Sequence, residues 1–305
     1  MVVNSAFPLV PLRPLIPTPF GRGVPEFPLV PLSPGSPVRA GFDRRLIDVS
    51  HEAFTKPAPT TPDSRIWRLI PHLEAPGTVQ MAIDRYLVEQ HQLGLMPATL
   101  RFYTWSPPAI SLGYHQHQYP DRWQNLIWNG RALDLVRRPT GGRAVLHQGD
   151  LTYAVVMSGL SGSCTQAYQQ ICEFLIQGWR SLGIQLHYGT AGRGYIHNPN
   201  CFGTATGADL VLEDGTKLIG SAQLRRGGVI LQHGSMRLEP DEDLFAQVFG
   251  TEAFAAIKLP LRRGEDLIQL VINALVASAK NCFHVDFAVQ PLSEQEWEKV
   301  YLDCD

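Results

Sequence analysis

A loop cysteine and an isolated lysine are the two residues of this 305-residue chain best suited to nucleophilic chemistry. Cys201 lies among Asn, Pro and Gly, in a segment where a thiol can be exposed enough to react. Lys217 is the one lysine between Lys56 and Lys258, in a chain with 21 Arg and 5 Lys. Burial can lower the pKa of a lysine, so a lysine beside a thiol can accept its proton. The pair therefore predicts a thiol nucleophile with a lysine proton acceptor.

Each of these residues also has a plainer interpretation. An isolated loop cysteine is commonly inert, and Cys164, preceded by Ser-Gly-Ser, is a rival by the same argument. Cys172 recurs with apolar residues at helical spacing, so we expect it in the core. Lys217 follows the Asp214-Gly215 turn closely and could simply face solvent.

A second candidate is the arginine- and glycine-rich segment 136–147. Adjacent glycines let the backbone approach a ligand closely, and turn amides can point at an anion. Arginines offer forked donors to phosphate or carboxylate, although an ordinary Gly-Gly hairpin with solvated arginines would have the same sequence. The chain has no Gly-Lys-Ser/Thr, so the segment is not a nucleotide-binding P-loop. The residues concerned are Arg137, Arg138, Gly141, Gly142, Arg143 and His147.

The elements that must position these residues are those of an α+β domain starting near Trp67. Apolar periodicity predicts helices at 78–92, 166–182, 243–249, 265–280 and 294–301. It predicts strands at 100–105, 109–112, 133–137, 144–147 and 151–157, and an antiparallel meander over 208–238. Strands joined as hairpins favour a mixed, largely antiparallel sheet flanked by helices over a doubly wound one.

Composition excludes several classes of protein. The formal net charge of −2 gives no general attraction to nucleic acid or anionic membrane, and we expect neither as a partner. No apolar run is long enough to span a bilayer. Five cysteines without a Cys-x-x-Cys pair argue against a disulfide framework or a zinc ribbon. We therefore expect a cytoplasmic protein with no metal site.

The first sixty residues differ from the rest of the chain. Thirteen of the 24 prolines lie in residues 1–62, which excludes regular helix or central strand there. We expect a proline-rich arm over 1–63, extended or disordered. The catalytic domain should then cover 64–255, with a C-terminal helical segment, 256–305, packed on it. The arm has no assigned role.

Six segments, taken in order, resemble the lipoate/octanoate transfer branch of the biotin/lipoate A/B protein ligase family. They cover about 155 residues. They are Met81-Ala82-Ile83-Asp84, Pro108 to Gln116, Arg137 to His147, Leu151-Thr152-Tyr153, Lys217 to Gln223, and Leu231 to Ser235. Asn200-Cys201-Phe202, followed by the lysine hairpin, resembles the octanoyl-[acyl carrier protein]:protein octanoyltransferases of this family.

The resemblance implies a fold related to class II aminoacyl-tRNA synthetases and biotin ligases. It implies a cysteine acyl-enzyme at Cys201 and a catalytic lysine at Lys217. The donor would be octanoyl-acyl carrier protein, and the acceptor a lysine of a lipoyl domain or a glycine cleavage H protein, without a cofactor. Substrate-binding residues would be Arg137, Arg138, Gly141, Gly142, Arg143, His147, Gly220, Ser221, Gln223 and His233.

Three other functions compete with this one. An ATP-dependent lipoate–protein ligase, using ATP and magnesium, would share the glycine and lysine motifs. A non-catalytic relative would only bind lipoyl domains. A biotin ligase is a further alternative, since Gly192-Arg193-Gly194 resembles its glycine-arginine loop outside the expected strand context. The sequence 205–209 also departs from the aromatic-acidic pattern of the family, which leaves the acyl pocket less defined than the nucleophile.

Overall fold

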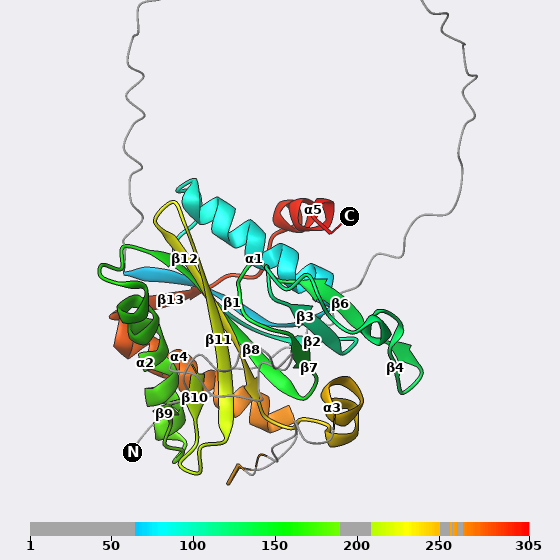
Figure 1. Cartoon of the computed structure of the whole chain (residues 1–305). Coiled ribbons are helices and arrows are strands. Elements are labelled where there is room, and N and C mark those ends of the chain that lie inside the picture. The colour runs from blue at the N-terminus through cyan, green and yellow to red at the C-terminus, as the bar shows by residue number, and fades with distance from the viewer. Residues whose placement is uncertain (1–64, 190–208, 251–256, 258, 262–264, 305) are drawn as a thin grey trace, which may run out of the picture. The chain divides into compact units, whose positions relative to one another are not determined.

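A large mixed sheet forms the centre of the computed structural model, which describes residues 65–189, 209–250, 257, 259–261 and 265–304. Its eight strands span the described part of the chain (Figure 1). In sheet order they are β13 (Asp286–Val289), β1 (Ile66–Ala75), β2 (Thr99–Trp105), β8 (Asp150–Ser158), β12 (Val229–Arg237), β11 (Lys217–Arg226), β10 (Asp209–Val211) and β9 (His187–Tyr188).

The pairing confirms the expected fold class. The strands β13, β1 and β2 run parallel to one another, and every other pairing in this sheet is antiparallel. The predicted meander is present as β10, β11 and β12, with Gly227 and Gly228 at positive φ in the second turn. Strand β13 places part of the C-terminal segment within the sheet itself. We expected only helices in this segment, so the strand is a correction.

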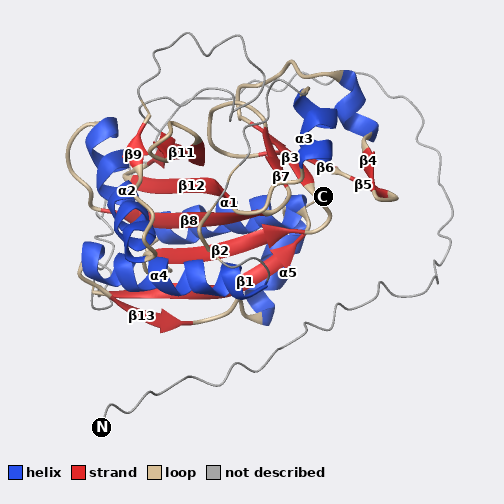
Figure 2. Cartoon of the chain, turned by 90° about the horizontal axis from the view of Figure 1, so that it is seen from below, coloured by secondary structure: helices blue, strands red, loops and turns tan. Residues whose placement is uncertain are grey.

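Helices cover both faces of this sheet. Buried side chains of α1 (Gly77–Gln92) and α5 (Glu294–Leu302) belong to one apolar cluster with one face of β2 and β8. Those of α2 (Cys164–Ser181) and α4 (Glu265–Phe283) belong to another cluster with the opposite face. Figure 2 shows α2 and α4 together in front of the strands and α1 behind them. The alternation of side chains along each strand divides the apolar residues between the two clusters.

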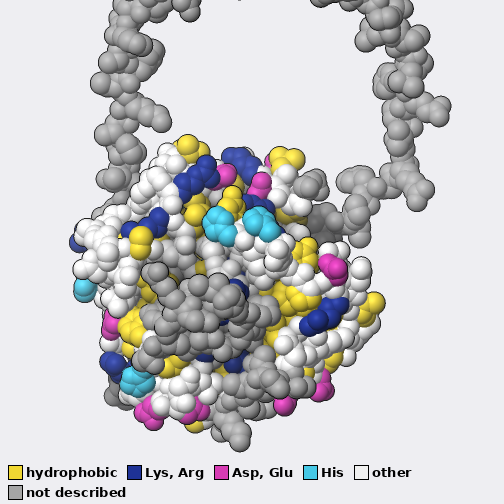
Figure 3. Space-filling model, viewed as in Figure 1, with side chains coloured by type: hydrophobic (Ala, Val, Ile, Leu, Met, Phe, Trp, Pro, Cys, Tyr) yellow, Lys and Arg dark blue, Asp and Glu magenta, His cyan; other side chains and the backbone are white. Residues whose placement is uncertain are grey.

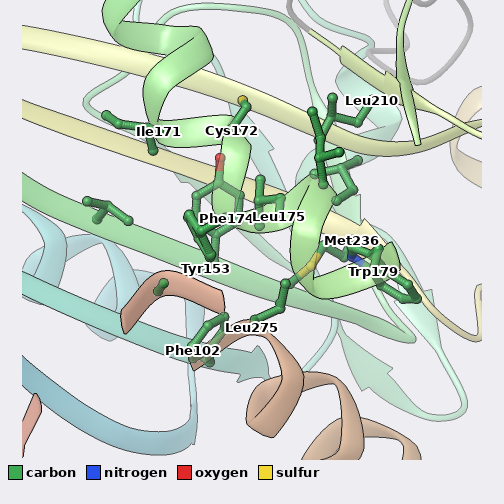
Figure 4. Close-up of a cluster of buried hydrophobic side chains, with 14 of the residues drawn as sticks. Phe102, Tyr153, Ile171, Cys172, Phe174, Leu175, Trp179, Leu210, Met236 and Leu275 are labelled. Carbon is green, nitrogen blue, oxygen red and sulfur yellow. The ribbon is translucent and has the colours of Figure 1, made fainter. Parts of the chain in front are cut away.

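Cys172 is part of the α2 cluster, as the periodicity predicted. It is fully buried, and Figure 4 shows it beside Ile171 and Phe174 with the Tyr153 ring nearby. The helix that carries it begins at a capping box, in which Ser163 and Gln166 satisfy each other's backbone amides. All five predicted helices are present.

A small second sheet packs beside the large one. It consists of β6 (Asp134–Arg137), β3 (Ala109–Leu112) and β7 (Val145–His147), and β3 pairs with both others. The helix α3 (Glu242–Phe249) and a 3-10 turn at Asp121–Asn125 contribute to its apolar cluster. A short hairpin, β4 (Ile127–Trp128) and β5 (Arg131–Ala132), follows the turn. These strands hold the arginine- and glycine-rich segment between β6 and β7.

The chain divides into two compact units, residues 1–56 and 57–305. The expected proline-rich arm, 1–63, lies outside the described residues. None of the described helices combines the length and apolar composition that crossing a membrane requires.

Candidate active site

A pocket lies between the α1 side of the large sheet and the small sheet. Aromatic rings, aliphatic side chains and glycine backbone make up most of its wall. The middle of β11 and the facing part of β12 supply one side, and β3, β7 and the loop before β7 supply another. Its lining residues are Met81, Tyr103, Trp105, Ser111, Arg138, Gly142, Val145, His147, Thr152, Gly220, Ser221, Ala222, His233, Gly234 and Ser235.

His147 is held at the pocket wall by three contacts. Its Nδ1 lies 2.8 Å from Asp150 Oδ2, and its Nε2 lies 2.8 Å from Ser111 Oγ. The ring stacks on Trp105, with centroids 3.8 Å apart. Burial lowers the pKa of His147, although Asp150 acts in the opposite direction. The imidazole is therefore a fixed, neutral part of the wall at neutral pH.

His233 lies opposite and has a similar partner. Its Nδ1 lies 2.7 Å from Asp84 Oδ2, and its Nε2 lies 2.6 Å from Thr140 Oγ1. Asp84 has no exposed surface; burial raises its pKa, but Arg101 and His233 outweigh this and hold that pKa below its usual value. The ionised carboxylate fixes the imidazole, which in turn fixes Thr140 at the start of the Gly-Gly loop.

Arg138 stabilises the Gly-Gly loop through hydrogen bonds to backbone carbonyl groups. Its guanidinium donates to the carbonyl oxygens of Ser111, Gly141 and Arg143 at 2.7–2.8 Å. Gly142 has a φ of 93°, and a Cβ on Gly113 would collide with its carbonyl oxygen, so both positions require glycine. Arg138 therefore positions the loop, and its predicted contact with a substrate stays a prediction.

Lys217 is buried, and its ammonium lies beside a carboxylate. Its Nζ is 2.8 Å from Asp209 Oδ1, and the two residues are only 4% exposed each. The alternative that this lysine simply faces solvent is therefore wrong. The sheet explains this ion pair. Strands β10 and β11 are antiparallel neighbours, and Lys217 lies opposite Val211, two residues along β10 from Asp209. Lys217 begins the strand whose residues Gly220, Ser221 and Ala222 line the pocket.

The thiols differ in reactivity. Cys201 lies outside the described residues, so its place in the site rests on the sequence. Its rival Cys164 is exposed at the start of α2 and is not among the residues that line the pocket. Burial raises the pKa of Cys172 to about 12, so that thiol stays protonated and inert at neutral pH.

The structure brings most of the predicted binding residues together. Arg138, Gly142, His147, Gly220, Ser221 and His233 line the pocket, whereas Arg137, Gly141 and Gln223 line a groove that adjoins it. Arg143 lines neither, although its carbonyl oxygen accepts from Arg138. Their contacts with substrate stay predictions.

Comparison with known proteins decides the family. A model of the lipoyl protein ligase A/B catalytic domain matches residues 76–259. The chain belongs to this family. Among its curated relatives, an octanoyltransferase LipM of Kyrpidia tusciae is 36% identical over 247 residues, covering 78% of this chain and 85% of that protein. The octanoyltransferase LipM of Bacillus subtilis is 38% identical over 194 residues, covering 60% of this chain and 69% of that protein.

Solved structures of lipoate-protein ligases have the same fold. One, described as a lipoate protein ligase from T. acidophilum with bound lipoic acid, is 26% identical with a TM-score of 0.63, covering 77% of this chain and 93% of that one. Lipoate-protein ligase A bound with ATP is 25% identical with a TM-score of 0.64, covering 78% and 94%. The predicted resemblance and fold are thereby confirmed.

Three carboxylates of this lipoyl protein ligase A/B domain were not predicted as site residues. Asp84 and Asp150 orient the pocket histidines, and Asp209 pairs with Lys217. Asp84 ends a segment that resembles the family, and Asp150 follows His147 by three positions, so both had a signal in the sequence. Asp209 starts a strand in the stretch that departs from the family pattern, and only the strand pairing reveals its role.

Proposed function

We propose that this acyltransferase moves an octanoyl group from octanoyl-acyl carrier protein to a lysine of a lipoyl domain or glycine cleavage H protein in lipoate biosynthesis. The observation that carries the proposal is the buried ion pair of Lys217 and Asp209. Lys217 begins strand β11, which lines an apolar pocket. Both features suit transfer of a hydrophobic acyl group through a thiol. The octanoyltransferase names of relatives that are 36–38% identical support the acyl group.

The pocket supports the choice of an acyl chain over a polar substrate. Met81, Tyr103, Trp105 and Val145 present apolar surface, and burial of a hydrocarbon chain there is favourable at about 0.8 kcal/mol per methylene. The two buried histidines lie in the wall with both ring nitrogens already engaged. They give the wall its shape, and the lowered pKa of His147 keeps that ring neutral at neutral pH.

In the first step, the Cys201 sulfur attacks the thioester carbonyl of the donor. A new C–S bond forms, the C–S bond to the carrier breaks, and the carrier leaves as a thiol. Lys217, as the neutral amine, accepts the proton of the Cys201 thiol to become an ammonium, and it then delivers this proton to the departing sulfur. Because one thioester replaces another, the step needs no nucleotide and no cofactor.

In the second step, the ε-amine of the acceptor lysine attacks the octanoyl-cysteine carbonyl. The amide C–N bond forms as the C–S bond to Cys201 breaks, and Lys217 passes the amine proton to the Cys201 sulfur. An amide is more stable than a thioester, so this step is downhill. Asp209 keeps the Lys217 side chain in one place while it gains and loses a proton through both steps. We place the reaction in the cytoplasm, in keeping with a sequence of five cysteines that has no Cys-x-x-Cys pair.

The intact mass of the protein after mixing with octanoyl-carrier protein, without ATP, tests the proposal. We expect an octanoyl adduct that thiols remove, and no adduct in the Cys201→Ser variant. Cys164→Ser and Cys172→Ser are matched controls and should still form the adduct. An adduct that persists in Cys201→Ser would refute the assigned nucleophile.

One observation favours a second function, ATP-dependent lipoate ligation. Lipoate-protein ligase A bound with ATP has this fold over 78% of the chain. The same assay separates the two, because a ligase would modify a lipoyl domain only when ATP and free lipoate or octanoate are supplied. Full activity of Cys201→Ala under those conditions would leave Cys201 without a catalytic role.

A further inference from the structure

A basic groove adjoins the acyl pocket on the outer side of the Gly-Gly loop. The two hollows share Arg138, and Gly141 and Gly142, adjacent in the chain, line one each. The groove runs between the C-terminal half of α1, the tip of the β11–β12 hairpin and the turn after β3. Its lining residues are Arg85, Val88, Glu89, Tyr114, His115, Arg137, Arg138, Pro139, Gly141, Gln223, Leu224, Arg225 and Arg226.

Charge in this groove differs from that of the whole chain. The formal net charge of the protein is −2, yet the described lining of the groove has five arginines against the single carboxylate of Glu89. Figure 3 shows dark blue Lys and Arg side chains gathered at the edge where the β11–β12 hairpin and α1 lie in Figure 1, with histidines beside them. Such a local patch attracts an acidic partner although the net charge does not.

The five arginines divide into structural and outward-facing ones. Arg138 holds the Gly-Gly loop, and Arg137 Nη1 donates to the carbonyl oxygens of the turn 113–116 that forms one wall of the groove. Arg85 forms an ion pair with Asp303, which directly follows helix α5. Arg225 and Arg226 are exposed at the end of β11, with Arg225 Nε donating to Gln223 Oε1 at 3.0 Å, so they are the cations of the groove that an approaching molecule meets first.

We infer that this groove is the docking site of the acyl donor, an acidic carrier protein with a phosphate in its prosthetic arm. This inference rests on the proposed function. The arginine forks suit phosphate oxygens, which the thioester arm of the carrier has and a lipoyl acceptor domain lacks. The groove also ends at the Gly-Gly loop of the pocket, so an arm lying in it directs its thioester towards the acyl pocket.

The test compares acylation of the enzyme by two donors. The double variant Arg225→Glu/Arg226→Glu should form the octanoyl adduct about tenfold more slowly from octanoyl-carrier protein. It should form the adduct at the wild-type rate from octanoyl-pantetheine, which has neither protein nor phosphate. Arg180→Glu is the matched control: Arg180 is an exposed arginine on α2, which covers the opposite face of the sheet from α1, and should keep both rates.

Binding without turnover separates this inference from the proposed function. Wild-type protein should bind the holo-carrier more tightly than the apo-carrier, which lacks the arm, and added salt should weaken binding; the double variant should lose both effects. Equal binding by wild type and double variant would overturn the docking site, whether or not an adduct forms. The inference is also wrong if the double variant slows octanoyl transfer from the preloaded enzyme to a lipoyl domain instead.

Discussion

The two ends of strand β11 carry charge of the same sign in opposite surroundings. At one end Lys217 is 4% exposed and pairs with Asp209 inside the protein. At the other end Arg225 and Arg226 lie exposed at the hairpin tip. Between them Gly220, Ser221 and Ala222 form part of the pocket wall.

The difference in residue type agrees with the difference in environment. A lysine has a compact ammonium that can gain or lose a proton in a protein, whereas an arginine stays charged and offers a planar fork. The buried end therefore suits proton transfer, and the exposed end suits recognition of oxyanions. In a chain that otherwise favours arginine, a lysine lies where the proposed mechanism moves a proton.

Exchange of the buried cation should have the largest effect. Lys217→Arg keeps the charge and the neighbour of Asp209 but removes a group that can transfer protons, so kcat should fall by about 10²–10⁴. Steady-state transfer of octanoate to a lipoyl domain measures it. Lys280→Arg is the control, because Lys280 also pairs with an aspartate but lies exposed, and it should keep its activity. Near-normal turnover of Lys217→Arg would refute the proton-transfer role.

Loss of the buried anion should have the next largest effect. Asp209→Asn leaves the shape unchanged but no longer fixes the Lys217 ammonium, so kcat should fall by up to about 100-fold with little change in KM. The unfolding free energy should also fall, by about 3–5 kcal/mol, because the variant removes one partner of a buried ion pair. Urea unfolding and kinetics measure both. Asp286→Asn, at the exposed Lys280 pair, should change neither.

A larger side chain between the two ends of β11 should change the selectivity for acyl-chain length more than the overall rate of transfer. Ala222→Leu adds three carbons to the pocket wall, so kcat/KM for octanoyl should fall about tenfold relative to hexanoyl. Competition between the two donors measures the ratio. Leu224→Met, in the groove on the same strand, is a volume-conserving control. An unchanged ratio in Ala222→Leu would place the acyl chain elsewhere.

The smallest expected effect concerns pH. Because burial lowers the pKa of His147, the unfolded chain takes up its proton at a higher pH than the folded protein does. The unfolding free energy should therefore fall as the pH drops below about 6.5, the ordinary value for histidine. His147→Asn should reduce this slope in urea unfolding between pH 8 and pH 5, while His187→Asn, at an exposed histidine, should not.

Local patterns predicted most of the fold. All five helices and the meander were predictable, because each buries one face at a regular spacing. Strand β1 was not predicted, since Pro71 interrupts its pattern and its pairing with β2 shifts register between Ile70 and Leu73. Strand β13 was missed as well, because its parallel partner β1 lies far away in the chain.

The site was only partly predictable, for a similar reason. The binding residues came from short motifs that resemble the family, and Lys217 stood out by its rarity. The carboxylate that orients His233 depends on a contact between α1 and β12: Asp84 and His233 are 149 positions apart in the chain. No local spacing could pair them.

The unbroken pairing of β11 with β12 has a consequence for the length of the donor. Register is continuous from Ile219 to Arg226, so backbone geometry fixes the separation between the two ends of the strand. At about 3.4 Å per residue, Lys217 and Arg225 are roughly 27 Å apart along it. Under the proposed docking, strand β11 is a rigid spacer, so the flexible arm of the donor must be long enough to reach the proposed reaction centre from the hairpin tip.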